Sequence, residues 1–284
     1  MQMSAARHWI ALAVACTRAR AARGVMAACV ALLYEQRVPA SGKLSASLCG
    51  NLPATRRENL LMERPFTDRR EAGRVLAGQL SAYAGRRDVI VLALPRGGVP
   101  VGYEVAKALH VPLDVLPVCK LGLPWQAELA MGALSSNGAQ YVDSSLVRTA
   151  GVSEAQLQSA MALARIELGR REARYRGERA PLAVAGRVAL VVDDGMATGA
   201  SLKAAALALA TLGPARIVAA LPVAPAGSQE RLGGTVDEFV CARMPEAFYS
   251  VGQFYLDFDQ VSDDTVRDLL ALAAADDTNG ETQI

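Results

Sequence analysis

Residues 188–201 read VALVVDDGMATGAS, and this stretch decides how the rest of the chain can be interpreted. Its first five residues, 188–192, form an apolar run typical of a buried strand, which leads directly into Asp193 and Asp194. Folding alone gives no reason for two adjacent carboxylates there, because burying an unpaired charge costs several kcal/mol. The pair must therefore face a group that donates hydrogen bonds or carries positive charge, such as sugar hydroxyls or a metal ion.

The loop after the two aspartates has the composition of a phosphate-binding loop. Its small and hydroxyl-bearing residues are Gly195, Ala197, Thr198, Gly199, Ala200 and Ser201. Small side chains let backbone N–H groups converge on an anion, and the following helix directs its positive end at the same place. The ligand that fits this site therefore has a phosphate group close to two neighbouring hydroxyls that donate to the carboxylates. A ribose 5-phosphate has both features.

Other phosphate and cation motifs fit this loop less well. A dinucleotide-binding turn needs G-x-G-x-x-G, whereas the glycines here are Gly195 and Gly199. A Walker loop needs lysine and then serine or threonine after its last glycine, but Ala200 and Ser201 follow. An EF-hand needs acids at alternate positions.

A second unusual loop, PRGG at 95–98, follows the apolar run VIVLAL at 89–94. Gly97 and Gly98 permit backbone conformations closed to other residues, and Arg96 carries a permanent positive charge. The two glycines could simply turn the chain, with Arg96 exposed at the surface. Taken with the loop at 193–201, however, this loop favours a pyrophosphate site, to which Lys120 at the end of the next strand adds a cation.

Apolar runs of β type alternate with helical patterns along the body of the chain. The predicted strands are 89–94, 112–118, 188–192, 216–223 and 236–242, and the predicted helices are 66–85, 101–110, 153–176, 202–213 and 262–274. This alternation predicts an α/β fold with a doubly wound, mostly parallel sheet and helices on both faces. Ligands bind beyond the carboxyl ends of such strands, so both unusual loops are expected on one edge. No regular element is predicted between 119 and 142.

Composition and charge exclude several classes of function. The 284 residues carry a net charge of +2, but residues 1–61 carry +6 and residues 62–284 carry −4. The body is thus mildly acidic, and without a basic stripe no nucleic-acid partner is expected. Five cysteines without a C-x-x-C pair, and only two histidines, favour free thiols in a reducing, cytoplasmic setting over a metal site.

The first 61 residues are interpreted separately as a leader or poorly ordered extension. Their apolar runs, WIALAVAC and GVMAACVALLY, are too short to span a membrane, so no membrane association is expected. Their arginine-rich, acid-poor composition is also that of a targeting segment. An over-extended leader, an amphipathic appendage and a signal peptide all remain open, and residues 62–284 are assigned as the functional domain.

The chain resembles the type I phosphoribosyltransferases, whose signature is an apolar strand, two acids and a small-residue loop that ends in serine or threonine. Its wider pattern is similar to that of a bacterial group of predicted phosphoribosyltransferases. The stretches that carry this resemblance are FTDRREAGRVLAGQL, LALPRGGVPVGYEVAKAL, LDVLPVCKLG, ELAMGA and VGQFYLDFDQVSDDTV, in order from Phe66 to Leu272.

The resemblance implies a substrate, phosphoribosyl pyrophosphate (PRPP), and a role for each part of the site. It implies that Asp193 and Asp194 hold the ribose hydroxyls, and that Arg96, Gly97 and Gly98 hold the pyrophosphate, often through a non-proline cis peptide. It also implies that the 5-phosphate lies against residues 196–201, that is Met196, Ala197, Thr198, Gly199, Ala200 and Ser201. Mg²⁺ is expected on PRPP oxygens with few direct protein ligands.

The same resemblance implies the reaction and the surrounding architecture. A nitrogen acceptor, such as a nucleobase or similar heterocycle, takes the 5-phosphoribosyl group and pyrophosphate leaves. Residues 121–140 correspond to a flexible loop, residues 243–258 to a small hood over the acceptor, and a homo-oligomer is expected. The alternative is a module of the same fold that senses PRPP or a nucleotide with weak or no catalysis.

One position departs from the pattern of the group. Cys119-Lys120 stands where the group usually has arginine and lysine, which removes about 1–3 kcal/mol of charge-assisted binding. Cys119 is interpreted as a buried small apolar residue in preference to a nucleophile. Glu128 is a candidate for contacting the acceptor, although a loop salt bridge suits it better. The hood aromatics, Phe248, Tyr249, Phe254 and Tyr255, either stack on a heterocycle or belong to the core, and core is the preferred interpretation.

Overall fold

The computed structural model describes residues 64–136, 138–176, 180–181 and 183–281. The interpretations placed on residues 1–61 therefore lie outside the described residues. Among the residues described, no helix combines the length and apolar character needed to cross a bilayer.

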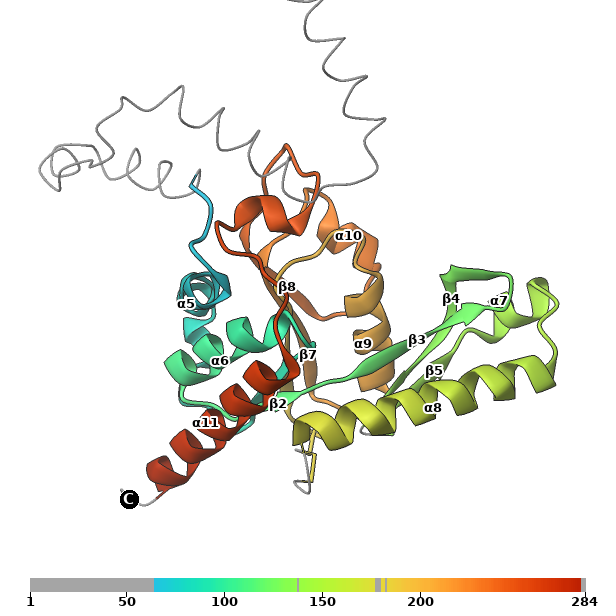
Figure 1. The fold of residues 1–284 in the computed structure, drawn as a ribbon, viewed down its shortest axis with the longest axis horizontal. Helices are drawn as coiled ribbons and strands as arrows, with labels where there is room; N and C mark the ends of the chain where they lie inside the picture. Colours follow the sequence, from blue (N-terminus) through green and yellow to red (C-terminus); the bar gives the residue numbers. More distant parts are fainter. Residues whose placement is uncertain (1–63, 137, 177–179, 182, 282–284) are drawn as a thin grey trace, which may run out of the picture. The chain divides into compact units, whose positions relative to one another are not determined.

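The centre of the described unit is a parallel sheet of five strands (Figure 1). Its strands, in spatial order, are β2 (Leu113–Val115), β1 (Val89–Ala93), β6 (Val188–Val192), β7 (Arg216–Val223) and β8 (Glu238–Arg243). Every adjacent pair runs parallel, and β1 and β6 are buried along their whole length. Continuous runs of valine, leucine and isoleucine are expected for strands covered on both faces. The predicted α/β class and parallel sheet are confirmed.

Helices cover both faces of this sheet, as predicted (Figure 1). Alternate residues of β1 show the division: Val89 and Val91 pack in the cluster with α5 (Arg69–Gln79), α6 (Gly98–Leu109) and α11 (Asp263–Glu281). Ile90 and Leu92 point the other way, into the cluster that contains α9 (Ala200–Ala210). The period of two residues along a strand thus divides one apolar run between two cores.

The prediction of one strand over 112–118 is wrong. The segment divides into β2 in the parallel sheet and β3 (Val118–Leu123) in a second sheet, with Pro117 between them. Proline cannot donate to a strand ladder, and its ring restricts the residue before it, so the chain changes direction at this point. The predicted boundaries of the other four strands agree with the structure to within about two residues.

The expectation of no regular element between 119 and 142 is also wrong for the described residues, and the segment 121–140 that the resemblance assigned to a flexible loop carries strands. Strands β3, β4 (Gln126–Ser135) and β5 (Gln140–Val142) form an antiparallel sheet, and α7 (Ser144–Thr149) follows it. Leu121, Leu123 and Met131 are buried against α8 (Glu154–Arg176), which lies along this sheet in Figure 1. The strands of this sheet are interrupted by glycine and proline in the sequence, so no strand pattern is evident. Their apolar face becomes apparent only when the helix that packs on it, α8, is known.

The remaining elements lie around the ends of the strands. They are η1 (Ser81–Tyr83), α10 (Ser228–Leu232) and η2 (Val251–Phe254). Tyr255 is buried between Phe66 and Phe258, with ring centroids 5.4 and 5.0 Å away. Phe248 and Phe254 pack against the same cluster, whereas Tyr249 is 87% exposed. Core packing is therefore confirmed for these aromatics except Tyr249.

Candidate functional site

The two unusual loops begin side by side at the point where the strand order reverses. From β1 the chain continues to β2 on one side, whereas β6 lies on the other side of β1. Ala93 at the end of β1 is in register with Val192 at the end of β6, and the Leu94 N–H donates to the Val192 carbonyl at 2.8 Å. In open parallel sheets, ligands bind at this switch point. The expectation of one shared edge is confirmed.

The glycines of the first loop allow the two loops to touch. A Cβ atom on Gly97 would lie 2.1 Å from the Asp194 Oδ2 atom, and one on Gly98 would lie 2.6 Å from the Val192 carbonyl oxygen. Gly97 and Gly98 thus allow the first loop to approach the second loop closely, in addition to turning the chain. The peptide bond between Pro95 and Arg96 is cis, as the resemblance implied.

Asp194, one member of the carboxylate pair, is held by groups from distant parts of the chain and itself holds Asp193. The Asp194 N–H donates to Asp193 Oδ1 at 2.9 Å, and Arg69 Nε donates to Asp194 Oδ2 at 2.8 Å. The Tyr255 hydroxyl donates to the Asp194 carbonyl at 2.6 Å, and the Arg69 guanidinium stacks on Phe258 at 4.0 Å. The position of the aspartates beyond β6 is therefore fixed from both ends of the described unit.

Arg69 is a site residue that the sequence interpretation missed. It is the first residue of α5, where the helix dipole disfavours positive charge. The run Asp68-Arg69-Arg70 at a helix start was thus a usable signal, since an arginine there needs an acidic partner from elsewhere. That partner is Asp194.

Burial raises the pKa of both carboxyl groups in the pair. For Asp193 the rise is large, and the neighbouring charge of Asp194 adds to the effect of burial. For Asp194 burial also dominates, but the hydrogen bond and charge of Arg69 oppose it. The pair titrates as a unit and holds a proton more tightly than an exposed aspartate does. A ligand that donates hydrogen bonds to these oxygens would relieve the cost of ionising them.

The loop at 195–201 presents backbone donors at the N-terminus of α9. Within the described residues, the N–H groups of Ala197, Thr198, Gly199 and Ser201 have no hydrogen-bond acceptor. Gly199, with φ at +80°, caps the helix, and Ala197 and Thr198 are exposed, as is Ser201. This arrangement suits a phosphate group, which accepts hydrogen bonds from backbone N–H groups at a helix start.

Met196 belongs to this loop, but neither its N–H group nor its side chain is available to a phosphate. Its N–H donates to the Val223 carbonyl at 3.0 Å, and its side chain is buried in the core beside α9. A Cβ atom on Gly199 would lie 2.6 Å from the Met196 Cε atom. The apolar side chain of Met196 therefore packs in the core beneath the loop and supports it there.

Arg231, which the sequence interpretation did not single out, borders the same loop. Its Nη1 atom donates to the Ala197 carbonyl at 3.1 Å from the short helix α10. This places a positive charge beside the predicted 5-phosphate position. No local signal marks Arg231, because the segment that carries it is separated from the loop by α9 and β7.

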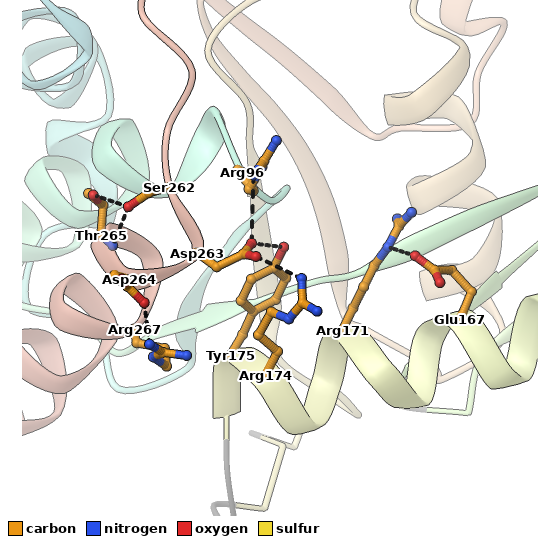
Figure 2. A network of polar contacts seen from close by, with 10 residues as sticks. All are labelled: Arg96, Glu167, Arg171, Arg174, Tyr175, Ser262, Asp263, Asp264, Thr265 and Arg267. Atoms are coloured by element: carbon orange, nitrogen blue, oxygen red, sulfur yellow. Dashed lines mark hydrogen bonds and ion pairs between the residues drawn. The ribbon is translucent and has the colours of Figure 1, made fainter.

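Arg96 lies in a polar network on the other side of the switch point (Figure 2). Its Nη1 atom is 3.8 Å from Asp263 Oδ1, and Asp263 also accepts hydrogen bonds from Arg174 at 2.7 Å and from the Tyr175 hydroxyl at 3.0 Å. Lys120 lies on β3 opposite Ala133, and its side chain forms no hydrogen bond or ion pair with other described residues. Arg96 and Lys120 are thus not joined by a direct contact.

Cys119 packs with its side chain toward α8, in the apolar cluster of the second sheet. Burial raises the pKa of its thiol, and no histidine lies among its electrostatic partners, so a nucleophilic role has no support. The interpretation of Cys119 as a small apolar residue is confirmed. The Glu128 side chain lies outside the described residues. In the part of the chain that is described, no group of three or more His, Cys, Asp or Glu side chains could hold a metal ion.

Comparison with known proteins agrees with this geometry. The family model described as phosphoribosyl transferase domain matches residues 68–259, and the chain therefore belongs to the phosphoribosyltransferase family. Two proteins named "Putative phosphoribosyl transferase", from the CDC 1551 and H37Rv strains of Mycobacterium tuberculosis, are each 45% identical over 201 residues. The aligned part is 71% of this chain but 45% of each relative, so the chain spans about half of their length.

A solved structure supports the fold at higher coverage. The crystal structure of TT1426 from Thermus thermophilus is 41% identical, with a TM-score of 0.67, over 72% of this chain and 97% of that one. Because the similarity covers nearly all of that protein, this chain contains the fold of the whole relative.

Proposed function

We propose that this protein binds PRPP and transfers its 5-phosphoribosyl group to a nitrogen acceptor, with release of pyrophosphate. The observation that carries the proposal is the direct packing of Gly97 and Gly98 against Asp194 and Val192. This packing brings a cationic loop and a carboxylate loop within a few ångströms at the switch point. A substrate with pyrophosphate on one side of a ribose and phosphate on the other matches that arrangement.

Asp193 and Asp194 bind the ribose in this proposal. The two ribose hydroxyls donate to carboxylate oxygens whose ionised form is otherwise costly, since burial raises the pKa of both groups. Arg69 Nε donates to Asp194 Oδ2 at 2.8 Å, and the other carboxylate oxygens of the pair accept from the sugar hydroxyls. The ribose therefore replaces solvent over a pair that the fold has already fixed in position.

The 5-phosphate lies on the N-terminus of α9. The unpaired N–H groups of Ala197, Thr198 and Gly199, and the hydroxyls of Thr198 and Ser201, supply the donors. Arg231 adds a positive charge next to the Ala197 carbonyl. Binding of the 5-phosphate orients C1 of the ribose toward Arg96. The binding energy of this phosphate, which does not react, thus contributes to catalysis.

Magnesium is compatible with this site as an ion that arrives with the substrate. The residues described provide two adjacent carboxylates at the ribose position but no cluster of three ligands that would hold the ion unaided. Asp193 and Asp194 would contact it through the ribose oxygens. When bound, Mg²⁺ neutralises charge on the pyrophosphate oxygens.

The chemical step follows from the placement of charge. The bond between C1 and the pyrophosphate oxygen breaks with its electron pair on the leaving group, and positive charge develops at C1. The acceptor nitrogen forms a bond to C1 and afterwards releases its proton to water. Arg96 stabilises the departing pyrophosphate, which is electrostatic stabilisation of charge as it develops. Asp193 and Asp194 keep the ribose oriented as its geometry at C1 changes.

The acceptor is proposed to be a nucleobase or a similar nitrogen heterocycle. Tyr249, exposed beside the half-buried Phe248 in the segment 243–258, is the hood aromatic free to stack on such a ring. A cytoplasmic setting, where PRPP and free bases occur together, and a homo-oligomeric assembly complete the proposal.

Pyrophosphate release by the full-length chain tests this function. The assay contains PRPP, Mg²⁺ and a panel of purine, pyrimidine and other nitrogen heterocycles, with calorimetry of PRPP binding in parallel. An Asp193→Asn/Asp194→Asn double variant is the control, and it should lose both binding and turnover. Absence of PRPP binding by the wild type would refute the proposal.

A second function, sensing of PRPP or a nucleotide without transfer, is favoured by one observation. The resemblance implies an arginine at position 119, on the side of the site that binds the leaving group, and this chain has Cys119 there. Tight PRPP binding with no pyrophosphate release on any acceptor would support this alternative over the transferase.

A further inference from the structure

The leaving-group side of the site has a second source of positive charge, helix α8. Glu167, Arg171, Arg174 and Tyr175 recur at spacings of three and four residues, which places them on neighbouring positions of one helix face. Figure 2 shows Arg171 and Arg174 leaving α8 on the side where Arg96 lies. This helix packs against β3, the strand that carries Cys119.

The Asp263 carboxylate contacts two arginines, Arg96 and Arg174. Asp263 lies 3.8 Å from Arg96 and 2.7 Å from Arg174, and it also accepts from the Tyr175 hydroxyl (Figure 2). Asp263 is the first residue of α11, so its charge also suits the positive helix end. The carboxylate therefore holds Arg96 and Arg174 together while neither is bound to a phosphate.

The charge of Arg171 acts on both Cys119 and Tyr175. Burial raises the pKa of the Cys119 thiol, and the positive charge of Arg171 opposes that rise. Burial and Asp263 raise the pKa of the Tyr175 phenol, and the charges of Arg96 and Arg171 oppose that rise too. One guanidinium thus influences both the Cys119 thiol and the Tyr175 phenol next to Arg96.

The present partner of Arg171 is easily exchanged. Its Nε atom is 2.8 Å from Glu167 Oε1, and the two side chains are 40% and 43% exposed. Exposed ion pairs of this kind contribute little to stability. A diphosphate carries several charges and offers bidentate acceptors to a guanidinium, so it competes well for the same donor.

We propose, on the basis of the phosphoribosyltransferase function above, that Arg171 supplies the positive charge that Cys119 lacks and binds the diphosphate leaving group together with Arg96. Asp263 positions Arg96 for that contact through the network that includes Arg174 and Tyr175. The site thus uses an arginine from α8 where the resemblance implies one from the strand.

Calorimetry of magnesium pyrophosphate binding to the full-length chain tests this assignment. Arg171→Gln is compared with Arg170→Gln, a substitution at an exposed neighbouring position of α8 that changes the net charge equally. Successive residues of an α-helix are separated by about 100° around its axis. We expect Arg171→Gln to weaken pyrophosphate binding roughly 10–100-fold, a range set by charge-assisted hydrogen bonds. The control should change it less than about threefold, and both variants should bind ribose 5-phosphate as the wild type does.

A rescue experiment adds an independent readout. Cys119→Arg placed in the Arg171→Gln background should restore most of the lost pyrophosphate affinity, because it returns a cation to the same ligand. Equal pyrophosphate affinity in the Arg171→Gln and Arg170→Gln variants, alongside normal PRPP binding, would overturn this inference and leave the proposed function standing. Failure of the wild type to bind PRPP or ribose 5-phosphate would overturn both.

Discussion

Arg69 and Asp194 are 125 residues apart in sequence, yet Arg69 Nε donates to Asp194 Oδ2 at 2.8 Å with both side chains largely buried. The contact ties the start of α5 to the loop after β6. It also explains how two adjacent aspartates are tolerated there, because one of them has a dedicated cation. The stability of the fold and the binding of substrate should both depend on this ion pair.

Replacing Arg69 by glutamine should destabilise the fold as well as impair substrate binding. The variant leaves the Asp194 carboxylate buried without its cation, and removing one partner of a buried pair costs about 3 kcal/mol. The measurement is urea-induced unfolding at neutral pH. Arg74→Gln, on the same helix but 55% exposed, is the control and should change stability by less than about 1 kcal/mol. Equal effects from the two substitutions would contradict the role given to Arg69.

Replacing Gly98 by alanine should damage the junction of the two loops. The new Cβ atom meets the Val192 carbonyl at 2.6 Å and the Asp193 Cα at 2.9 Å, and backbone atoms cannot move aside as a side chain can. Overpacking of this kind costs about 1–3 kcal/mol. Gly78→Ala in α5 has no neighbour within 4 Å and should instead stabilise by about 0.5–1 kcal/mol. The measurements are thermal unfolding of the Gly98→Ala and Gly78→Ala variants and calorimetry of their PRPP binding. A Gly98→Ala protein that is as stable as the wild type and binds PRPP would refute the close packing.

Asp193→Asn should change how stability depends on pH. The folded pKa of Asp193 is raised by burial and by Asp194, so the folded state binds its proton more tightly than the unfolded state. Wild-type stability therefore falls as pH rises from the ordinary aspartate pKa through the raised folded value. The asparagine variant lacks this loss and should be the more stable protein at neutral pH, while it binds PRPP poorly.

The check for Asp193 is a series of thermal unfolding curves between acidic and neutral pH. The difference in stability between Asp193→Asn and wild type should grow with pH, and Asp276→Asn, at an exposed position of α11, is the control. A difference for Asp193→Asn that shrinks as pH rises would mean that the carboxylate is stabilised, not destabilised, by its surroundings.

Replacing Arg231 by glutamine should weaken binding of the 5-phosphate specifically. Its guanidinium donates to the Ala197 carbonyl beside the free N–H groups of the phosphate loop. Loss of one cation near a phosphate should reduce ribose 5-phosphate affinity about 3–10-fold, with little effect on free pyrophosphate. Calorimetry with the two ligands separates these effects. Arg267→Gln, whose partner is Asp264 on the same helix, is the control, and a loss of pyrophosphate affinity equal to that of ribose 5-phosphate would contradict the assignment.

The helix and strand pattern could be predicted because local apolar runs carry it. Val89–Ala93 and Val188–Val192 are buried on both faces, and such strands look the same in any parallel sheet. The second sheet could not be predicted in the same way. Its strands, 118–123 and 126–135, gain their apolar face only from packing on α8, which begins about twenty residues after β4 ends.

The α/β class, the two loops at strand ends and the chemistry that their residues can perform follow from the amino-acid sequence, because these depend on neighbouring residues in the chain. The residues that complete the site depend on the fold. Arg69, Tyr255 and Arg231 reach the loops from segments remote in sequence. Met196, adjacent to the site in sequence, is instead buried beneath it. The reason is physical: buried charges and backbone donors must find partners wherever the fold brings them, and no local pattern records that choice.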